Sequence, residues 1–251
     1  ASLGVALTDV APEGLLPPLW HWILFQDWRP AGALGPDGHP KRGGFLPPVH
    51  HLGRRMWAGG RIAFPACLRI GESVKRTSTI TAIAEKEGGA GPLVFVTIRH
   101  AIESASGLAI EEEQDLVYRS VSSIARKEAK AEPLPQGGIV ESILPDPVLL
   151  FRYSALTGNG HRIHYDADYA REVEGYPGLV VHGPLQATLL ALLARRIHPS
   201  GRMVRFSFRA LRPAFAGERL TLVGTETGRQ VVLSARDPAG AVTMTAEAEF
   251  A

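Results

Sequence analysis

The segment from Pro184 to Ile197, PLQATLLALLARRI, carries the strongest helical pattern in the chain. A proline stands in its first turn, leucines follow at helical spacing, and two arginines lie near its end, where cations interact favourably with the helix dipole. We therefore expect a buried central helix here. Four segments of strand composition, separated by turn signals, follow it at Met203–Leu211, Arg219–Glu226, Gln230–Arg236 and Ala241–Phe250. The second half of the chain is thus predicted to be a helix followed by a strand meander.

The first half shows a similar order. A short helix and then a loop are expected from Leu15–Trp28 onward. A second helix is expected over Val49–Trp57, because Pro47-Pro48 suits a helix start and Gly59-Gly60 a helix end. Four segments rich in Val, Ile, Thr and Phe come next, at Arg61–Ile70, Glu72–Ala84, Leu93–Glu103 and Leu108–Val121.

This repetition predicts an α+β fold built by duplication. One long helix wrapped by a strongly bent antiparallel sheet is the hotdog fold, and two copies, a double hotdog, fit 251 residues. The alternative is an α+β chain whose halves are alike by coincidence. Ala125–Pro147 mixes charge with Pro and Gly, which is typical of a connector. We predict an N-terminal repeat at residues 1–130, a linker at 131–147 and a C-terminal repeat at 148–251.

Composition excludes several classes of protein. The 27 Lys and Arg against 25 Asp and Glu give a net charge of +2, too small for a surface that binds nucleic acid. The single cysteine, Cys67, excludes an intramolecular disulfide and a cysteine-based zinc site, and fits a reducing compartment. The longest strongly apolar run, Leu185–Ala194, is shorter than the roughly 20 residues that cross a bilayer. Because Ala1–Val10 does not resemble a secretory signal, a cytoplasmic location is expected.

Most polar chemistry gathers in Tyr153–Gly183, which holds three of the nine histidines. This segment resembles the signature of the MaoC-like, R-specific enoyl-CoA hydratase and dehydratase family, a Gly-Asp-x-Asn-Pro-x-His run followed by an aromatic-Ala pair and a His-Gly pair. Tyr169-Ala170 and His182-Gly183 match the later pairs. The Gly, Asp, Asn and His positions are occupied by Gly158, Asn159, His161 and His164.

The two-domain subgroup, which includes mitochondrial hydroxyacyl-thioester dehydratase and mesaconyl-CoA and itaconyl-CoA hydratases, is more similar still. Its TxNxHRIHYDxxYA and GYPGLVVHGPL runs match this chain, and the likeness extends to Pro17–Trp22, Leu34–Pro48 and Arg54–Gly60. The resemblance implies reversible hydration of an α,β-unsaturated acyl-CoA, with a branched dicarboxylic acyl group as one candidate, and no metal or redox cofactor.

His164 is the expected acid–base residue. Hydration needs a group that takes a proton from water near neutral pH and returns it at Cα, and imidazole suits both steps. The alternative is a histidine that only binds a backbone carbonyl. Asn159 departs from the wider family, because an amide cannot take a proton as a carboxylate can. It either orients the water or holds the turn between Gly158 and Gly160. Asp166 and Asp168 are expected to cap a helix rather than to replace the carboxylate.

Gly183 is expected to supply an oxyanion site. At the start of the central helix its N–H has no helical partner, and the absence of a side chain lets a thioester carbonyl approach. Its alternative use is a tight helix entry. Arg162, Arg55 and Tyr165 are the expected substrate-binding residues. Arg162 either orients the loop or meets a substrate carboxylate, and Arg55 pairs with a substrate carboxylate or with a phosphate of the pantetheine nucleotide. The first repeat lacks the signature and is expected to carry no catalytic residue, and its paired histidines at 50 and 51 lack the neighbours of a zinc site.

Three other functions stay open at this point. One is dehydration of a 3-hydroxyacyl group on a carrier protein, which needs a cavity mouth open to protein-borne pantetheine. Another is thioester hydrolysis, which calls for a carboxylate where this chain has Asn159. The third is acyl-CoA binding without catalysis. An acyl-CoA is the expected partner, nucleic acid and membrane are not, and a homodimer is one assembly open to the chain.

Overall fold

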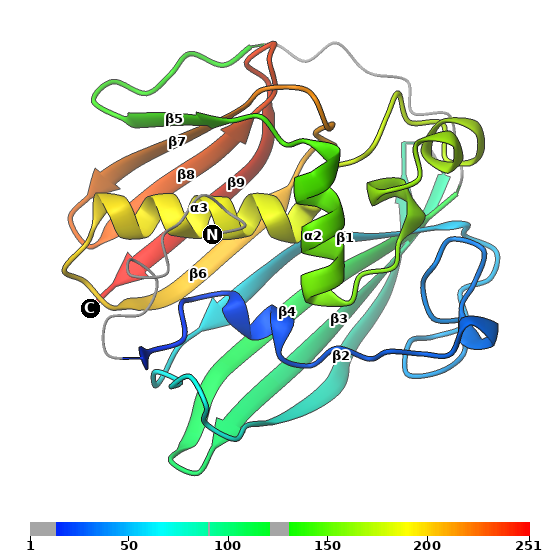
Figure 1. Cartoon of the computed structure of the whole chain (residues 1–251), viewed down its shortest axis with the longest axis horizontal. Helices are drawn as coiled ribbons and strands as arrows, with labels where there is room; N and C mark the ends of the chain where they lie inside the picture. The colour runs from blue at the N-terminus through cyan, green and yellow to red at the C-terminus, as the bar shows by residue number, and fades with distance from the viewer. Residues whose placement is uncertain (1–13, 90, 121–130) are drawn as a thin grey trace.

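The computed structural model describes residues 14–89, 91–120 and 131–251. Within them nine strands form one antiparallel sheet in the order β2-β3-β4-β1-β6-β9-β8-β7-β5 (Figure 1). The strands are β1 Arg54–Ala63, β2 Lys75–Gly88, β3 Gly91–Ser104, β4 Gly107–Arg119, β5 Ile139–Ile143, β6 Met203–Ala210, β7 Leu220–Thr227, β8 Gln230–Arg236 and β9 Val242–Phe250.

The strand order confirms the duplication. At the centre of the sheet β1 pairs with β6, so that Gly60 lies opposite Phe208 and Ile62 opposite Phe206. Outward from this junction the order is β1-β4-β3-β2 on one side and β6-β9-β8-β7 on the other. These four strands of one half therefore have their counterparts in the other, as in a double hotdog fold, and β5 is an additional edge strand beside β7.

The central helix of the second half is confirmed. Helix α3, Gly183–Ile197, crosses one face of β6 to β9 (Figure 1). Leu185, Leu190 and Leu193 are fully buried against the sheet. Burial of several leucines at about 2 kcal/mol each holds the helix there. The four strands expected after it agree with β6 to β9 to within one residue at every end.

The helix expected over Val49–Trp57 is wrong. Strand β1 begins at Arg54 and continues through Gly59 and Gly60. Their role is close packing rather than helix termination, since a Cβ atom on Gly59 would lie 2.6 Å from the carbonyl oxygen of Phe208 on β6. The pairing of β1 with β4 and β6, which local sequence does not encode, decides the conformation.

The first half therefore repeats the sheet without the long helix. Its helical segments within the described residues are two short 3-10 helices, η2 Trp20–Ile23 and η3 Ala31–Ala33. Where α3 covers one half of the sheet, the corresponding face of the first half is left with η2 and neighbouring loops (Figure 1). This difference leaves room for a cavity.

The predicted linker contributes structure that its composition does not indicate. Strand β5 pairs with β7, and helix α2, Pro147–Thr157, begins after Asp146, whose carboxylate accepts a hydrogen bond from the Leu149 N–H at 2.7 Å.

Residues 1–13 and 121–130 lie outside the described residues. Three expectations fall there: the N-terminal segment read for a secretory signal, the strand end at Val121 and the start of the connector. The division at 131–147 stays a prediction. Across the described chain, no helix is long and apolar enough to span a membrane.

Candidate active site

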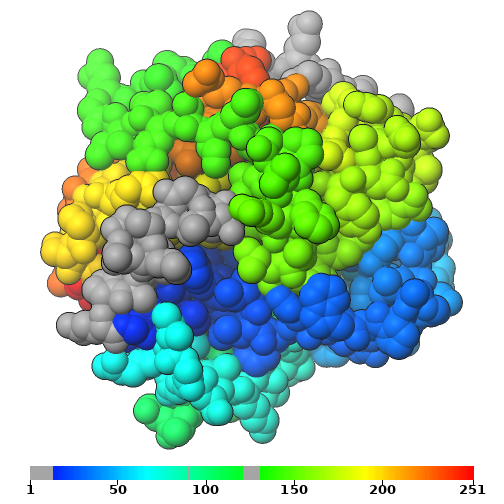
Figure 2. Space-filling view, in the orientation of Figure 1, coloured from blue at the N-terminus to red at the C-terminus, as the bar shows by residue number. Residues whose placement is uncertain are grey.

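A cavity of about 1360 Å³ lies between the two halves. Both halves line it. Asp37, His39 and Arg55 come from the first, and Asn159, His164 and Gly183 from the second. The signature region after α2 lies directly against the N-terminal loops, as the adjoining yellow-green and blue surfaces in Figure 2 show. A backbone hydrogen bond of 2.9 Å from Arg162 N to Asp37 O joins them.

His164 stands at the end of the short helix η4, Arg162–His164, and is buried. Its Nδ1 lies 2.7 Å from the carbonyl oxygen of Val180. A carbonyl only accepts hydrogen bonds, so Nδ1 carries the hydrogen and Nε2 presents its lone pair. Burial lowers the pKa of His164 to about 4. The residue is thus a neutral imidazole near pH 7, as a base must be, and the carbonyl contact fixes its tautomer.

The imidazole of His182 packs against the imidazole of His164. The two imidazoles are stacked, with ring centroids 3.6 Å apart and planes 18° apart. The Nε2 of His182 is hydrogen-bonded to the Ser154 hydroxyl at 2.8 Å, and the side chain is fully buried. Burial, with the nearby His164, holds the pKa of His182 well below its usual value. His182 therefore packs against the base as a neutral ring.

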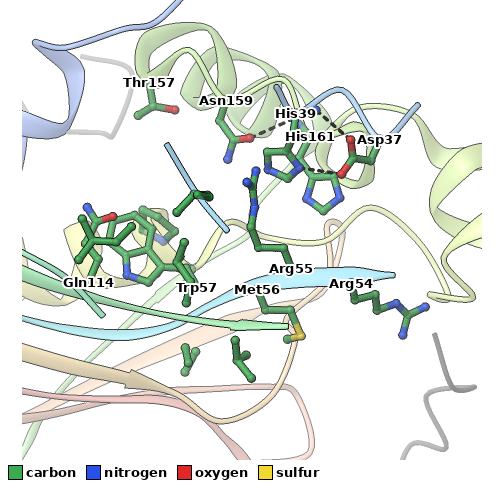
Figure 3. A pocket seen from close by; sticks show the side chains of 18 of the residues that line it. Asp37, His39, Arg54, Arg55, Met56, Trp57, Gln114, Thr157, Asn159 and His161 are labelled. Atoms are coloured by element: carbon green, nitrogen blue, oxygen red, sulfur yellow. Dashed lines mark hydrogen bonds and ion pairs between the residues drawn. The ribbon is translucent and has the colours of Figure 1, made fainter. Parts of the chain in front are cut away.

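Asn159 follows Gly158, which ends α2 with a left-handed φ of 63°. Its Oδ1 accepts a hydrogen bond from the backbone N–H of His161 at 3.0 Å (Figure 3). This contact holds the turn and uses one lone pair of the amide oxygen. The amide Nδ2 has no partner among the described residues, and Asn159 lines the cavity. Holding the turn and contacting a water are therefore compatible in one side chain.

Gly183 is the first residue of α3 and lines the cavity. Its N–H is one of the donors that no helical carbonyl accepts. A Cβ atom there would meet only the Met244 methyl group, at 3.9 Å. Packing therefore does not require glycine at this position, whereas an approaching oxyanion would benefit from the open N–H.

Arg162 and Tyr165 do not line the cavity, and the contacts of Arg162 are those of its alternative role, orienting the loop. Arg162 donates hydrogen bonds to Asp166 at 2.7 and 3.0 Å and to the Pro36 carbonyl at 3.1 Å. The Tyr165 hydroxyl donates to the Gly160 carbonyl at 2.8 Å. Both side chains hold the signature loop together instead. Asp166 also accepts a hydrogen bond from Tyr169 N at 3.0 Å, at the start of the π-helical turn η5, Tyr169–Val173, as expected for a capping residue.

Arg55 on β1 does line the cavity and extends toward Asn159 and His161 in Figure 3. Within the described chain its guanidinium has no hydrogen-bond or ion-pair partner. Its charge contributes to lowering the pKa values of His39 and His161, though less than burial does. Arg54, its neighbour, is instead engaged with Glu174, at 2.8 Å between Nε and Oε2. Both arginines line the cavity, but the Arg54 guanidinium is held by Glu174, whereas that of Arg55 is available to a ligand.

The first half also brings Asp37 and His39 to the cavity, although the sequence predicts no catalytic residue there. Asp37 Oδ2 lies 3.0 Å from His39 Nδ1, and the His39 ring lies 4.2 Å from that of His161. One potential ligand atom from each of Asp37, His39 and His161 lies within 4.8 Å of the other two, a spacing that could bind a metal cation. The only sequence signal for Asp37 and His39 is the Leu34–Pro48 likeness, which specifies no role.

A second polar group lies along the cavity, on the face of β4 that η2 covers. The buried Glu112 carboxylate accepts hydrogen bonds from Trp22 at 2.8 Å and Gln114 at 2.9 Å, and lies 3.0 Å from His21 Nε2. Burial would raise the pKa of Glu112, but these partners lower it below the usual value. The sequence does not predict this site, because His21 and Trp22 lie about 90 residues before Glu112 and only the packing of η2 on β4 brings them together.

Comparison with known proteins identifies the family of this chain. The family model of hydroxyacyl-thioester dehydratase type 2 matches residues 19–216. Mesaconyl-C(4)-CoA hydratase from Chloroflexus aurantiacus is 48% identical over 256 residues, covering 99% of this chain and 91% of the relative.

Two solved structures share the fold. A MaoC-like dehydratase superposes with a TM-score of 0.72 at 15% identity, over 97% of this chain and 86% of that one. A Mycobacterium tuberculosis protein described as a double hotdog gives a TM-score of 0.56 at 13% identity, over 100% and 88%. Because the family model matches well over half of the residues, the chain belongs to the hydroxyacyl-thioester dehydratase type 2 family.

Proposed function

We propose that this chain catalyses the reversible addition of water to the double bond of an α,β-unsaturated acyl-CoA thioester. The observation that carries the proposal is the neutral His164, whose Nδ1 is bound to Val180 and whose Nε2 has no partner among the described residues of the cavity. The family match and the similarity to a mesaconyl-C(4)-CoA hydratase support it.

The residues divide the reaction between them. As the water oxygen forms its bond to Cβ, Nε2 of His164 takes a proton from that water. The π electrons move toward the thioester carbonyl, and the resulting enolate oxygen is stabilised by the Gly183 N–H at the helix start. The imidazolium then returns the proton to Cα. Water is added and no electrons are gained or lost, and dehydration is the same path reversed.

Arg55 favours a substrate with a carboxylate. It reaches the cavity without a carboxylate partner among the described residues, and a guanidinium binds a carboxylate with two parallel hydrogen bonds. We therefore propose a branched dicarboxylic acyl-CoA, of the kind that the named Chloroflexus relative hydrates, as the substrate. The polar cluster around Glu112, facing the same cavity, also makes a long fatty acyl chain the poorer fit.

Two observables separate the reaction classes. Hydration removes the absorbance of the enoyl thioester without releasing thiol, hydrolysis releases thiol, and a binding module does neither. We expect loss of absorbance alone. Thiol release would establish a thioesterase, and activity confined to acyl groups on carrier protein would establish the carrier-protein dehydratase.

Substrate charge is tested by comparing kcat/KM for mesaconyl-CoA, itaconyl-CoA and crotonyl-CoA. Arg55→Gln should lower kcat/KM for the dicarboxylic substrates about 100-fold, since it leaves a carboxylate unpaired, and change crotonyl-CoA much less. Arg152→Gln, on the exposed face of α2, is the matched control. A wild-type preference for crotonyl-CoA that Arg55→Gln does not alter would contradict the proposed substrate.

A cytoplasmic location and a homodimer belong to the same proposal. The location is supported by the exposed free thiol of Cys67, which suits a reducing compartment. Cell fractionation and light scattering of the purified chain test the two statements.

A further inference from the structure

The active site as described has one base and no carboxylate at the signature. Asn159 occupies the position where the wider family has a carboxylate, and its amide oxygen already accepts the His161 N–H. A water beside His164 therefore has one ring nitrogen to receive its first hydrogen, and no carboxylate stands at the Asn159 position to receive its second. The structure supplies a basic group from outside the signature.

The supplying element is the loop that contains Asp37, Gly38 and His39. Gly38 has a φ of +87°, and a side chain there would overlap the Gly160 carbonyl group. With the Arg162 N to Asp37 O hydrogen bond, this contact fixes the loop against the signature. The first half of the chain thus delivers its own polar side chains to a site whose other residues come from the second half.

Within this loop Asp37 holds His39 in place with two hydrogen bonds. Its Oδ1 accepts the backbone N–H of His39 at 3.1 Å, and its Oδ2 accepts the Nδ1–H at 3.0 Å. The carboxylate fixes the tautomer, leaving the Nε2 lone pair without a partner among the described residues. The ring is four-fifths buried and lines the cavity. Hydrogen-bonding to a carboxylate makes the opposite ring nitrogen a better acceptor.

We propose that His39, oriented by Asp37, is a second catalytic residue that accepts the other O–H of the attacking water. This inference rests on the proposed hydration. His164 removes one proton and returns it to Cα, while His39 Nε2 accepts a hydrogen bond from the hydrogen that stays on oxygen and becomes the product hydroxyl. The bonds formed are O–Cβ and Cα–H, the bond broken is one O–H of water, and Asp37 keeps its charge throughout.

The chemistry at His39 differs from that at His161. His161 lines the same cavity but has no carboxylate bonded to its ring, and burial with the neighbouring His39 lowers its pKa to about 2. Burial also lowers the pKa of His39, against the raising effect of the Asp37 hydrogen bond. Charged groups that act on His39 are Asp37 and Glu174, which raise its pKa, and Arg55, which lowers it. Of His39 and His161, His39 is therefore the one whose ring is hydrogen-bonded to a carboxylate and whose Nε2 is the better hydrogen-bond acceptor.

The test compares His39→Gln and Asp37→Asn in the full chain with mesaconyl-CoA as the probe. We expect His39→Gln to lower kcat about 100-fold, the usual cost of a misplaced reactant, with KM changed by no more than about 3-fold. Asp37→Asn should lower kcat about 10-fold and move the acid limb of kcat/KM to lower pH, because removal of the carboxylate lowers the pKa of His39. His51→Gln and Asp168→Asn, both exposed and outside the cavity lining, are the matched controls.

Several outcomes decide the matter. Asn at position 37 keeps an oxygen for the His39 N–H, so this variant carries the test if His39→Gln fails to fold. Unchanged kcat and pH profile in both variants of an active wild type would overturn the role of His39 and leave the proposed hydration standing. A wild type inactive on every thioester would remove the hydration itself. Activity lost on chelation and restored by zinc would also overturn the inference, because the cluster would then hold a cation.

Discussion

Gly38 and Gly160 lie backbone against backbone where the two halves of the chain meet, so closely that a Cβ atom on Gly160 would lie 2.7 Å from the Gly38 carbonyl oxygen. This contact joins the Asp37–His39 loop to the signature loop, and neither glycine itself lines the cavity. A small change here should therefore affect catalysis through position alone.

Gly38→Ala is expected to lower kcat about 100-fold, because a methyl group forces the two loops apart and a shift of about 1 Å in a catalytic group costs that much. Gly32→Ala is the control, since a Cβ atom at Gly32 meets no other atom within 4 Å. Steady-state kinetics with thermal melting would separate the loss of activity from a loss of stability. Full activity in Gly38→Ala would show that the loop contact does not position the site.

His164→Ala should reduce turnover by about two orders of magnitude or more, the usual contribution of a positioned acid–base group. The circular dichroism spectrum is expected to match the wild type. His50→Ala, in an exposed loop outside the cavity lining, should keep full turnover. Near-normal turnover in His164→Ala would remove the base from the mechanism.

Asn159→Asp should retain activity with an altered pH profile. A carboxylate oxygen can still accept the His161 N–H, so the turn is kept. The added negative charge raises the pKa of nearby histidines, so these become protonated at higher pH and the acid limb of kcat/KM moves upward. If this variant folds but no longer adds water, Asn159 contributes more than a replaceable contact.

The buried histidines should make stability depend on pH. Burial lowers the pKa values of His161, His164 and His182, so the folded chain keeps these rings neutral while the unfolded chain takes up protons below pH 6.5. The free energy of unfolding should fall on going from pH 7 to pH 5, by about 2 kcal/mol for each ring that stays neutral. Urea titrations at the two pH values measure this, and equal stabilities would contradict it.

A chain that begins at Pro145 should be poorly soluble and inactive, although it contains the whole signature. It loses β1, which pairs with β6 over residues 59–63, and β5, which pairs with β7. Two sheet edges become exposed, and exposed edges favour aggregation. Size-exclusion chromatography and the hydration assay provide the measurement. A monodisperse and fully active C-terminal half would contradict the requirement for both repeats.

The sequence by itself determines the features that depend on local pattern. The spacing of apolar residues in Pro184–Ile197 specifies α3, alternation and turn residues specify β6 to β9, and the signature identifies His164 and Gly183 as candidates. Each of these signals lies within one continuous segment, so it can be read without knowing which distant segments pack together.

Only the tertiary structure decided the remainder. Gly59 and Gly60 are in a strand because β4 and β6 lie beside them, and Arg55 faces the cavity while Arg162 is held by Asp166. His39 reaches the cavity with His161 because two glycines let their loops pack backbone against backbone. These outcomes depend on which distant segments come together, and the composition of either segment alone does not specify its partner.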